Sequence, residues 1–503
     1  MKAGETLRTV VLGGLAAVVV ASPTSAFAAG DEGSAWWRAV DATVWDAGPS
    51  AGVRRSAGTV PASPVVFGQG VDPAAGLVAE TCDDGAGCGD GLSCGDGLLC
   101  GDGLGCGESV GCGEGVAATA PPLWASEPLL GDWGGARTRW EQAKLLDVDL
   151  PLTQFYQGNA SGGRRQRFAY GGKMDYFFTG VGGLVVMHAE TRFGEDVNFA
   201  AAPFAPVNVN MLYPDFSHTT AITGLMFNVP LVESQEWILS FGKINSLDNW
   251  NLLYPMAGRG VDGFMNVSNV LPLSLARTVP LSTLGASVTK LHDGQVQAVL
   301  QIHDSNNTPT TSGVSELFDN GANLLAYYRL GTRNGGHAAA ATWASGDFTA
   351  LDPGGWILVP GEPIVPPVGS NPWSAHYIVD QNLWTDGGNA QRKVYFYSQL
   401  GLADQQLTPI EWTWSGSLEA VGLSRRRPRD RMGAGVFYSG LSGDFRSLLA
   451  PVLAYDDAFG GEVYYNAAVS RWFRLTTDLQ VIEPADSRNA TAVAVGLRLK
   501  NEF

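Results

Sequence analysis

Charged side chains recur at every second position in several segments of the chain, and they are of the types that bind small polar molecules. The eight candidate binding residues are Lys173, Asp175, His188, Glu190, Arg192, Arg474, Asp478 and Arg498. Both signs of charge occur among them, which suits a neutral polyol better than a ladder of one sign would. The alternative is that most of them form ion pairs with one another on a water-exposed surface and contribute little to the stability of the fold.

No catalytic motif accompanies these groups. Gly-x-Ser-x-Gly occurs only within residues 30–126, at 48–52, 91–95 and 107–111, where no strand and helix pattern surrounds it as a nucleophile elbow requires. The chain contains no His-Glu-x-x-His pair that would hold a zinc ion. Pairs of carboxylates such as Glu190 and Asp196 are present, but such pairs occur in most chains of this length. The sequence therefore predicts that the protein is not an enzyme and needs no cofactor or metal.

The elements that carry the candidate residues alternate with a period of two, as β-strands do. In the last thirteen residues Val493, Val495, Leu497 and Leu499 share one parity, while Arg498 and Lys500 hold the other. The same pattern recurs in the segments 146–152, 170–178, 185–192, 295–303 and 474–481. Such strands have one apolar and one polar face, and a terminal Phe503 is typical of the last strand of an outer-membrane barrel.

The start of the chain predicts export. Residues 1–29 combine Lys2 and Arg8, an apolar run at 10–20 and small residues at 26–28, the pattern of a secretory signal peptide. The rest of the chain has no apolar run of roughly 18 residues that could form a membrane helix. A membrane-spanning form must then be a closed barrel, because lipid cannot satisfy the backbone groups of an open sheet.

Chain length and connections predict an all-β fold, an antiparallel transmembrane β-barrel of about 16 strands in residues 127–503. A short helix at 136–144 precedes it. Short turns are expected at 424–430 and 470–472, and long loops at 443–459 and 484–490. Two aromatic pairs, Trp412 with Trp414 and Tyr395 with Tyr397, are interpreted as anchors at the lipid interface; sugar stacking is the alternative.

Residues 30–126 form a low-complexity extension with a six-residue cysteine repeat at 82–115. All six cysteines lie there, from Cys82 to Cys112. The preferred interpretation is an acidic, Gly-rich spacer with local disulfides; a stacked repeat that binds a cation through its aspartates is the alternative. The net charge of −17 argues against a nucleic-acid partner.

Four segments also resemble a known family. GDWGGARTRWEQAKLLDVDL (131–150) and the final segment 461–503 are similar to the ends of the carbohydrate-selective porins, called OprB-type outer-membrane porins. Residues 241–250 (FGKINSLDNW) and 427–444 resemble the family less specifically. The resemblance implies a 16-stranded barrel in the cell outer membrane that passes monosaccharides such as glucose by diffusion. A secreted, soluble, β-rich carbohydrate-binding protein or a polysaccharide hydrolase is the alternative.

Within this hypothesis, His188, Glu190 and Arg192 are the favoured constriction contacts, because they project from one face of one strand. The expected partners are small sugars, outer-membrane lipid, and the barrel-assembly machinery through the C-terminal strand that ends at Phe503. The chain is expected to act as a monomer or a homotrimer.

Overall fold

The computed structural model describes residues 129–503 except 203, 213–218, 233–235, 255–259, 357–365 and 452. The predicted signal peptide at 1–29 and the cysteine-rich extension at 30–126 lie outside the described residues.

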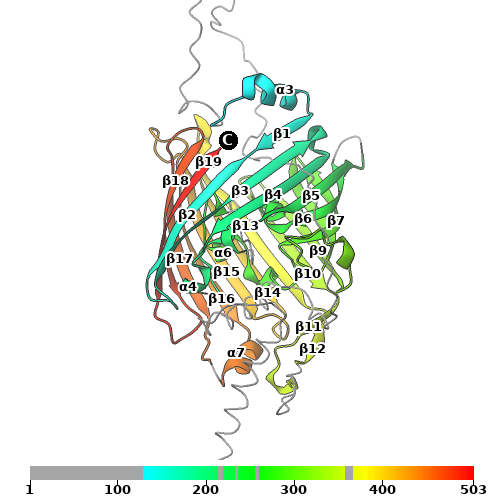
Figure 1. The fold of residues 1–503 in the computed structure, drawn as a ribbon, viewed down its shortest axis with the longest axis vertical. Coiled ribbons are helices and arrows are strands. Elements are labelled where there is room, and N and C mark those ends of the chain that lie inside the picture. The colour runs from blue at the N-terminus through cyan, green and yellow to red at the C-terminus, as the bar shows by residue number, and fades with distance from the viewer. Residues whose placement is uncertain are drawn as a thin grey trace, which may run out of the picture.

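Sixteen antiparallel strands of the described chain form one closed wall, so the predicted fold class is confirmed (Figure 1). The strands are β2 (Pro151–Ser161), β3 (Arg167–Gly180), β4 (Val185–Gly194), β5 (Thr220–Pro230), β6 (Trp237–Asn245), β7 (Ser282–His292), β8 (Gln295–Asp304), β9 (Ala322–Thr332), β10 (Gly335–Ala344), β13 (Trp373–Asp386), β14 (Asn389–Ala403), β15 (Ile410–Val421), β16 (Arg431–Leu441), β17 (Ala458–Ala468), β18 (Phe473–Glu483) and β19 (Ala492–Glu502).

The barrel closes between its last and first strands. β19 pairs with β2, with Arg498 opposite Phe155 and Lys500 opposite Thr153. A short strand, β1 (Leu146–Asp149), precedes β2 and pairs with the end of β3. Each of the sixteen wall strands therefore has two neighbours, so the wall itself has no open edge.

The alternation of the sequence sets the two faces of the wall. On β19 the Leu497 side chain is 44% exposed on the outside, whereas Arg498 beside it is fully buried on the inside. Exposed leucines, valines and aromatics cover the outer face of other strands in the same way, as Leu300 and Val463 do. No helix among the described residues is long and apolar enough to cross a membrane.

Short and long connections alternate around the barrel. The turns at 424–430 and 470–472 are short, and the connections at 442–457 and 484–491 are longer and lie at the other end, as predicted. Figure 1 shows the C-terminus and α3 (Ala136–Gln142) at one end, and α7 (Gly443–Leu449) with the hairpin β11 (Asp347–Thr349) and β12 (Val368–Ser370) at the opposite end. The predicted helix at 136–144 ends two residues early, where Lys144 adopts a positive φ.

Two of the long connections fold into the barrel. Residues 246–281, between β6 and β7, carry α5 (Ser246–Leu253), α6 (Val267–Val270) and the 3-10 turn η6 (Leu273–Leu275). We call this range the inserted segment. It crosses the interior, since α6 packs against β15 and β16, and Figure 1 draws α6 within the outline of the barrel. Residues 195–219 carry α4 (Asn198–Ala201) and the 3-10 turn η4 (Val209–Met211); here the Val207 carbonyl accepts Gln157 and Gln480 from the wall.

The interior is therefore only partly polar, which differs from the expectation of a wet lumen. Phe264, Val267 and Val270 of the inserted segment pack in one apolar cluster with Phe204 and with Phe445 of α7. These side chains were not recognised as interior because they lie in loops, where strand alternation carries no information.

One aromatic pair also differs from its interpretation. Trp414 is exposed on the outer face as expected, but Tyr395 and Tyr397 are 1% and 3% exposed and point into the barrel. The anchor interpretation of this tyrosine pair is wrong. It followed the preference of tyrosine for interfaces, whereas on β14 the outward parity belongs to Val394, Phe396 and Leu400.

Candidate functional site

Five of the eight predicted residues come together on the inner face of β3 and β4. In the antiparallel register, Lys173 lies opposite Arg192 and Asp175 lies opposite Glu190. His188 is on β4 as well, two positions before Glu190 in the sequence. Directly opposed residues share a face, so the alternation predicted from sequence places all five side chains inside the barrel. Each of them is at most 4% exposed. We call these five residues the β3–β4 cluster.

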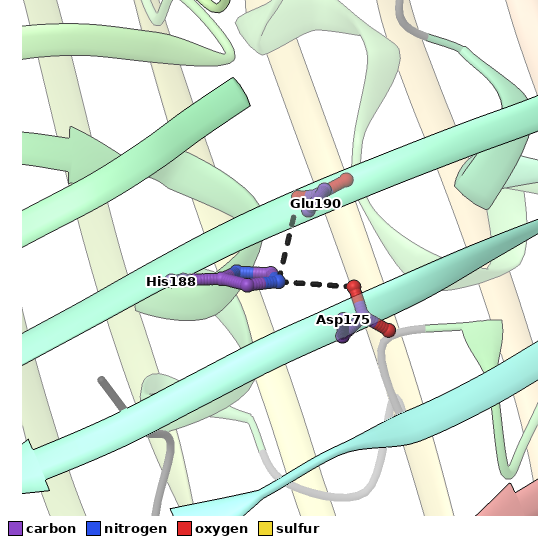
Figure 2. A group of neighbouring side chains, drawn as sticks. All are labelled: Asp175, His188 and Glu190. Atoms are coloured by element: carbon purple, nitrogen blue, oxygen red, sulfur yellow. Dashed lines mark hydrogen bonds and ion pairs between the residues drawn. The ribbon is translucent and has the colours of Figure 1, made fainter. Parts of the chain in front are cut away.

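Charges of opposite sign alternate through this cluster. Lys173 Nζ lies 2.9 Å from Asp175 Oδ1, and Arg192 Nε donates to Glu190 Oε2 at 3.0 Å. Between the two pairs, His188 Nε2 lies 3.0 Å from Asp175 Oδ1 and 3.6 Å from Glu190 Oε1. Figure 2 shows the His188 imidazole pointing into the space between the two carboxylates, which come from neighbouring strands. Buried charges persist only when paired in this way.

The cluster is joined to the start of the inserted segment. His188 Nδ1 lies 2.6 Å from Asp248 Oδ2 on α5, and Asn245 Nδ2 donates to Glu190 Oε1 at 3.2 Å. The Asn245 side chain also accepts the backbone N–H groups of Leu247 and Asp248, which is how it caps α5. Sequence reasoning missed Asn245 and Asp248. The signal was the Asn-Ser-x-Asp start of a helix within 241–250.

The other three predicted residues lie on β18 and β19, where Arg474 and Arg498 contact loops and Asp478 contacts a residue of its own strand. Arg498 donates to the carbonyls of Gly260 at 2.5 Å and Gly263 at 2.9 Å in the inserted segment. Asp478 accepts Gln480 Nε2 at 2.9 Å, and Arg474 donates to the Arg429 carbonyl in the short turn before β16. These three point inward as predicted, but their bonds go to protein groups.

Glu462 on β17 is a further interior residue that sequence reasoning missed. Its carboxylate accepts the backbone N–H groups of Met265 at 2.5 Å and Asn266 at 3.0 Å, and Asn269 Nδ2 at 3.1 Å. Three donors on one carboxylate form a strong contact, because bonds to an ionised acceptor are stronger than neutral ones. The inserted segment is thus fastened on the wall opposite its origin.

An ion pair also holds this part of the inserted segment. Lys500 Nζ on β19 lies 3.0 Å from Asp262 Oδ2. Burial raises the pKa of the Asp262 carboxyl, but the Lys500 ammonium and nearby arginines lower it by more, so that this pKa lies below its usual range. Together with Arg498 and Glu462, this pair fixes residues 260–269 to β17 and β19.

Residues 241–503, more than half of the chain, match the sequence profile of the carbohydrate-selective porin, OprB family. The chain belongs to this family. The match covers three segments whose resemblance was noted, 241–250, 427–444 and 461–503, but not 131–150. No curated protein matches the sequence.

The comparison with solved structures concerns the fold alone. The high-pH structure of Pseudomonas putida OprB superposes with a TM-score of 0.62 at 17% identity, over 75% of this chain and 99% of that one. The low-pH structure of the same protein gives 0.43 at 14% identity, over 75% and 99%. A loop-deletion mutant of OmpT, an outer membrane protein of Vibrio cholerae, gives 0.40 at 10% identity, over 71% and 99%.

Proposed function

We propose that the protein is an outer-membrane porin through which neutral carbohydrates, monosaccharides such as glucose among them, diffuse passively. The observation that carries the proposal is the interior of the barrel. A segment fastened at both ends narrows it, and charges of both signs on β3 and β4 face that segment. A narrow passage with balanced charge and many hydrogen-bonding groups replaces the water around a neutral polyol without strongly retaining an ion.

Asp248 would be the residue that contacts the sugar directly. Its side chain is 26% exposed, whereas the five members of the β3–β4 cluster are almost fully buried behind it. Asp248 is held by His188, so its carboxylate has a fixed position from which to accept sugar hydroxyls. In this scheme the β3–β4 cluster positions the Asp248 carboxylate and determines the charge around it. Weak, reversible binding is what transport by diffusion requires.

The outer face supports a membrane location over a soluble carbohydrate-binding protein. Leu300, Val463 and Leu497 are exposed on three different strands, and such apolar side chains all around a barrel suit hydrocarbon. We extend the proposal to export by the signal peptide and to recognition of β19, ending at Phe503, by the barrel-assembly machinery. A monomer and a homotrimer are both compatible with this scheme.

The test is single-channel recording of the purified protein in planar bilayers. We expect a small, stable conductance that glucose blocks in a concentration-dependent way, and swelling of proteoliposomes in glucose. Arg192→Ala should change the glucose block, because it leaves Glu190 without its nearest cation. Arg425→Ala, in a periplasmic turn, is the matched control and should leave the block unchanged. A purified protein that forms no conductance, or that remains dissolved without detergent, would overturn the proposal.

A further inference from the structure

Three side chains of the β3–β4 cluster lie close enough together that they could hold one divalent metal ion. Asp175, His188 and Glu190 each offer one ligand atom, and these atoms all lie within 4.8 Å of one another. His188 Nε2 is 3.0 Å from the Asp175 oxygen and 3.6 Å from the Glu190 oxygen. Ligands about 2.0–2.1 Å from a tetrahedral zinc ion are about 3.3 Å apart. Figure 2 shows the three groups converging on one point between β3 and β4.

Neighbouring residues already orient these groups as they are oriented around metals. His188 Nδ1 lies 2.6 Å from Asp248 and Nε2 lies 3.0 Å from Asp175, so both ring nitrogens face carboxylates. When the ring gives up its Nε2 hydrogen, Nδ1–H donates to Asp248 and Nε2 can bind a metal ion between Asp175 and Glu190. A carboxylate bonded to the far nitrogen of the ligand histidine is the usual outer support of a zinc site. Arg192 holds the other oxygen of Glu190, and Phe177 stacks on the imidazole with ring centres 4.1 Å apart.

The charge of the cluster leaves room for a cation that binds reversibly. Three carboxylates, those of Asp175, Glu190 and Asp248, face the two cationic side chains of Lys173 and Arg192 when His188 is neutral. Lys173 Nζ lies 2.9 Å from the same Asp175 oxygen that a metal would use. A metal ion must therefore displace this ammonium group. That competition weakens binding and separates this arrangement from a permanent structural site.

We propose that Asp175, His188 and Glu190 form a reversible binding site for a divalent transition metal ion, with Zn²⁺ as the fitting chemistry. One nitrogen and two oxygen ligands are a set that zinc accepts, and three protein ligands leave a fourth position open for water. The bound ion would join β3 to β4 and, through His188 and Asp248, to the inserted segment. If the protein is the sugar channel proposed above, the metal then lowers sugar permeation.

Metal binding is tested first, independently of transport. The full mature chain is purified in detergent, reduced, and alkylated at its six cysteines so that thiolates contribute no ligands, and it is then titrated with Zn²⁺ in a calorimeter. We expect one Zn²⁺ per barrel with micromolar affinity. His188→Asn should weaken binding by at least about tenfold, and Asp248→Asn by about tenfold through loss of the outer support. Lys173→Met should tighten it by about tenfold, because a competing cation is removed.

His376→Asn is the matched control. His376 is also buried on the inner face, but its ring contacts Ser374 and no carboxylate. The variant should bind Zn²⁺ like the original protein. Equal binding by the original protein and by His188→Asn would place the metal elsewhere and overturn the proposal. Absence of binding in both the original protein and Lys173→Met would also overturn it.

The effect on transport is measured separately. Micromolar Zn²⁺ should reduce the single-channel current and the glucose-driven swelling rate of the original protein and of His376→Asn, and a chelator should restore both. His188→Asn should be insensitive. Zinc binding without any change of current would contradict the expected effect of zinc on sugar permeation but would leave the proposed zinc site standing. A channel that conducts sugar but binds no zinc would overturn this inference and leave the proposed function intact.

Discussion

The carboxylate of Glu462 accepts the backbone N–H of Asn266 at 3.0 Å, although the two residues are 196 positions apart in the sequence. Met265 and Asn269 donate to the same carboxylate. The inserted segment leaves the wall at β6 and is fastened at β17, on a different part of the barrel. The position of the inserted segment inside the barrel is therefore set by contacts between this segment and the far wall, which a few side chains make.

Glu462→Gln should loosen this contact. Met265 and Asn266 donate to different oxygens of the carboxylate. Glutamine replaces one of these oxygens by an NH2 group that cannot accept, so one backbone N–H loses its acceptor and docking of the segment is weakened by about 3 kcal/mol. We expect a higher single-channel conductance and entry of disaccharides in liposome swelling. Glu483→Gln changes the same charge at the end of β18, where the carboxylate contacts Thr491, and should change neither quantity. An unchanged size limit in a folded Glu462→Gln barrel contradicts the anchoring role.

Gly435→Val tests the same docking from the neighbouring wall strand, because Gly435 on β16 pairs with Glu462 on β17. A Cβ atom at Gly435 would lie 2.9 Å from Asn269 Oδ1 and 3.1 Å from the Phe264 ring, so the absent side chain makes room for the segment. Valine should push residues 264–269 off the wall and raise conductance as Glu462→Gln does. Gly331→Ala, where no heavy atom lies within 4 Å of the added carbon, is the control. A normal conductance in Gly435→Val means that the segment tolerates the shift.

Alternation along strands made the wall predictable. The opposite faces of Leu497 and Arg498 follow from position alone, and so does the shared inner face of His188, Glu190 and Arg192. What fills the interior was not predictable, because its donors lie in irregular segments far away in sequence. Glu462 has the inward parity of its strand, but nothing local shows that it binds residues 265–269. Tyr395 was misplaced when residue preference was weighed above parity.

Arg498 is the second wall residue that holds the inserted segment, and two substitutions should weaken its contact to different degrees. Its guanidinium group donates to two carbonyls of the inserted segment, those of Gly260 and Gly263, and it also reaches Thr476 Oγ1. Lysine keeps the charge but cannot span both carbonyls, so Arg498→Lys should raise conductance less than Arg498→Met does. Limited proteolysis of the inserted segment should follow the same order. Equal effects of the two variants would show that the forked geometry, and not the charge, matters.

Asp430 joins two neighbouring short turns at the end of the barrel that carries the C-terminus. Its contacts should make the stability of the barrel sensitive to acid. Its carboxylate accepts Arg427 Nε at 2.7 Å and the Ala468 N–H at 2.9 Å, and also the Tyr465 hydroxyl. Burial raises the pKa of Asp430, but these donors lower it by more, so the pKa lies below its usual value. The stabilisation is complete above the unfolded-state pKa, about 3.9, and is lost as the pH falls through the lower folded-state pKa.

Asp430→Asn should therefore lower the unfolding temperature in detergent at pH 7, through a loss of about 2 kcal/mol. The original protein should lose stability as the pH falls below about 4, and the variant should show a smaller loss over the same range. Heat-dependent gel mobility measures both midpoints. Asp293→Asn, on the exposed turn between β7 and β8, should behave like the original protein because its side chain is 91% exposed. Equal acid sensitivity in Asp430→Asn and the original protein would assign this sensitivity to other carboxylates.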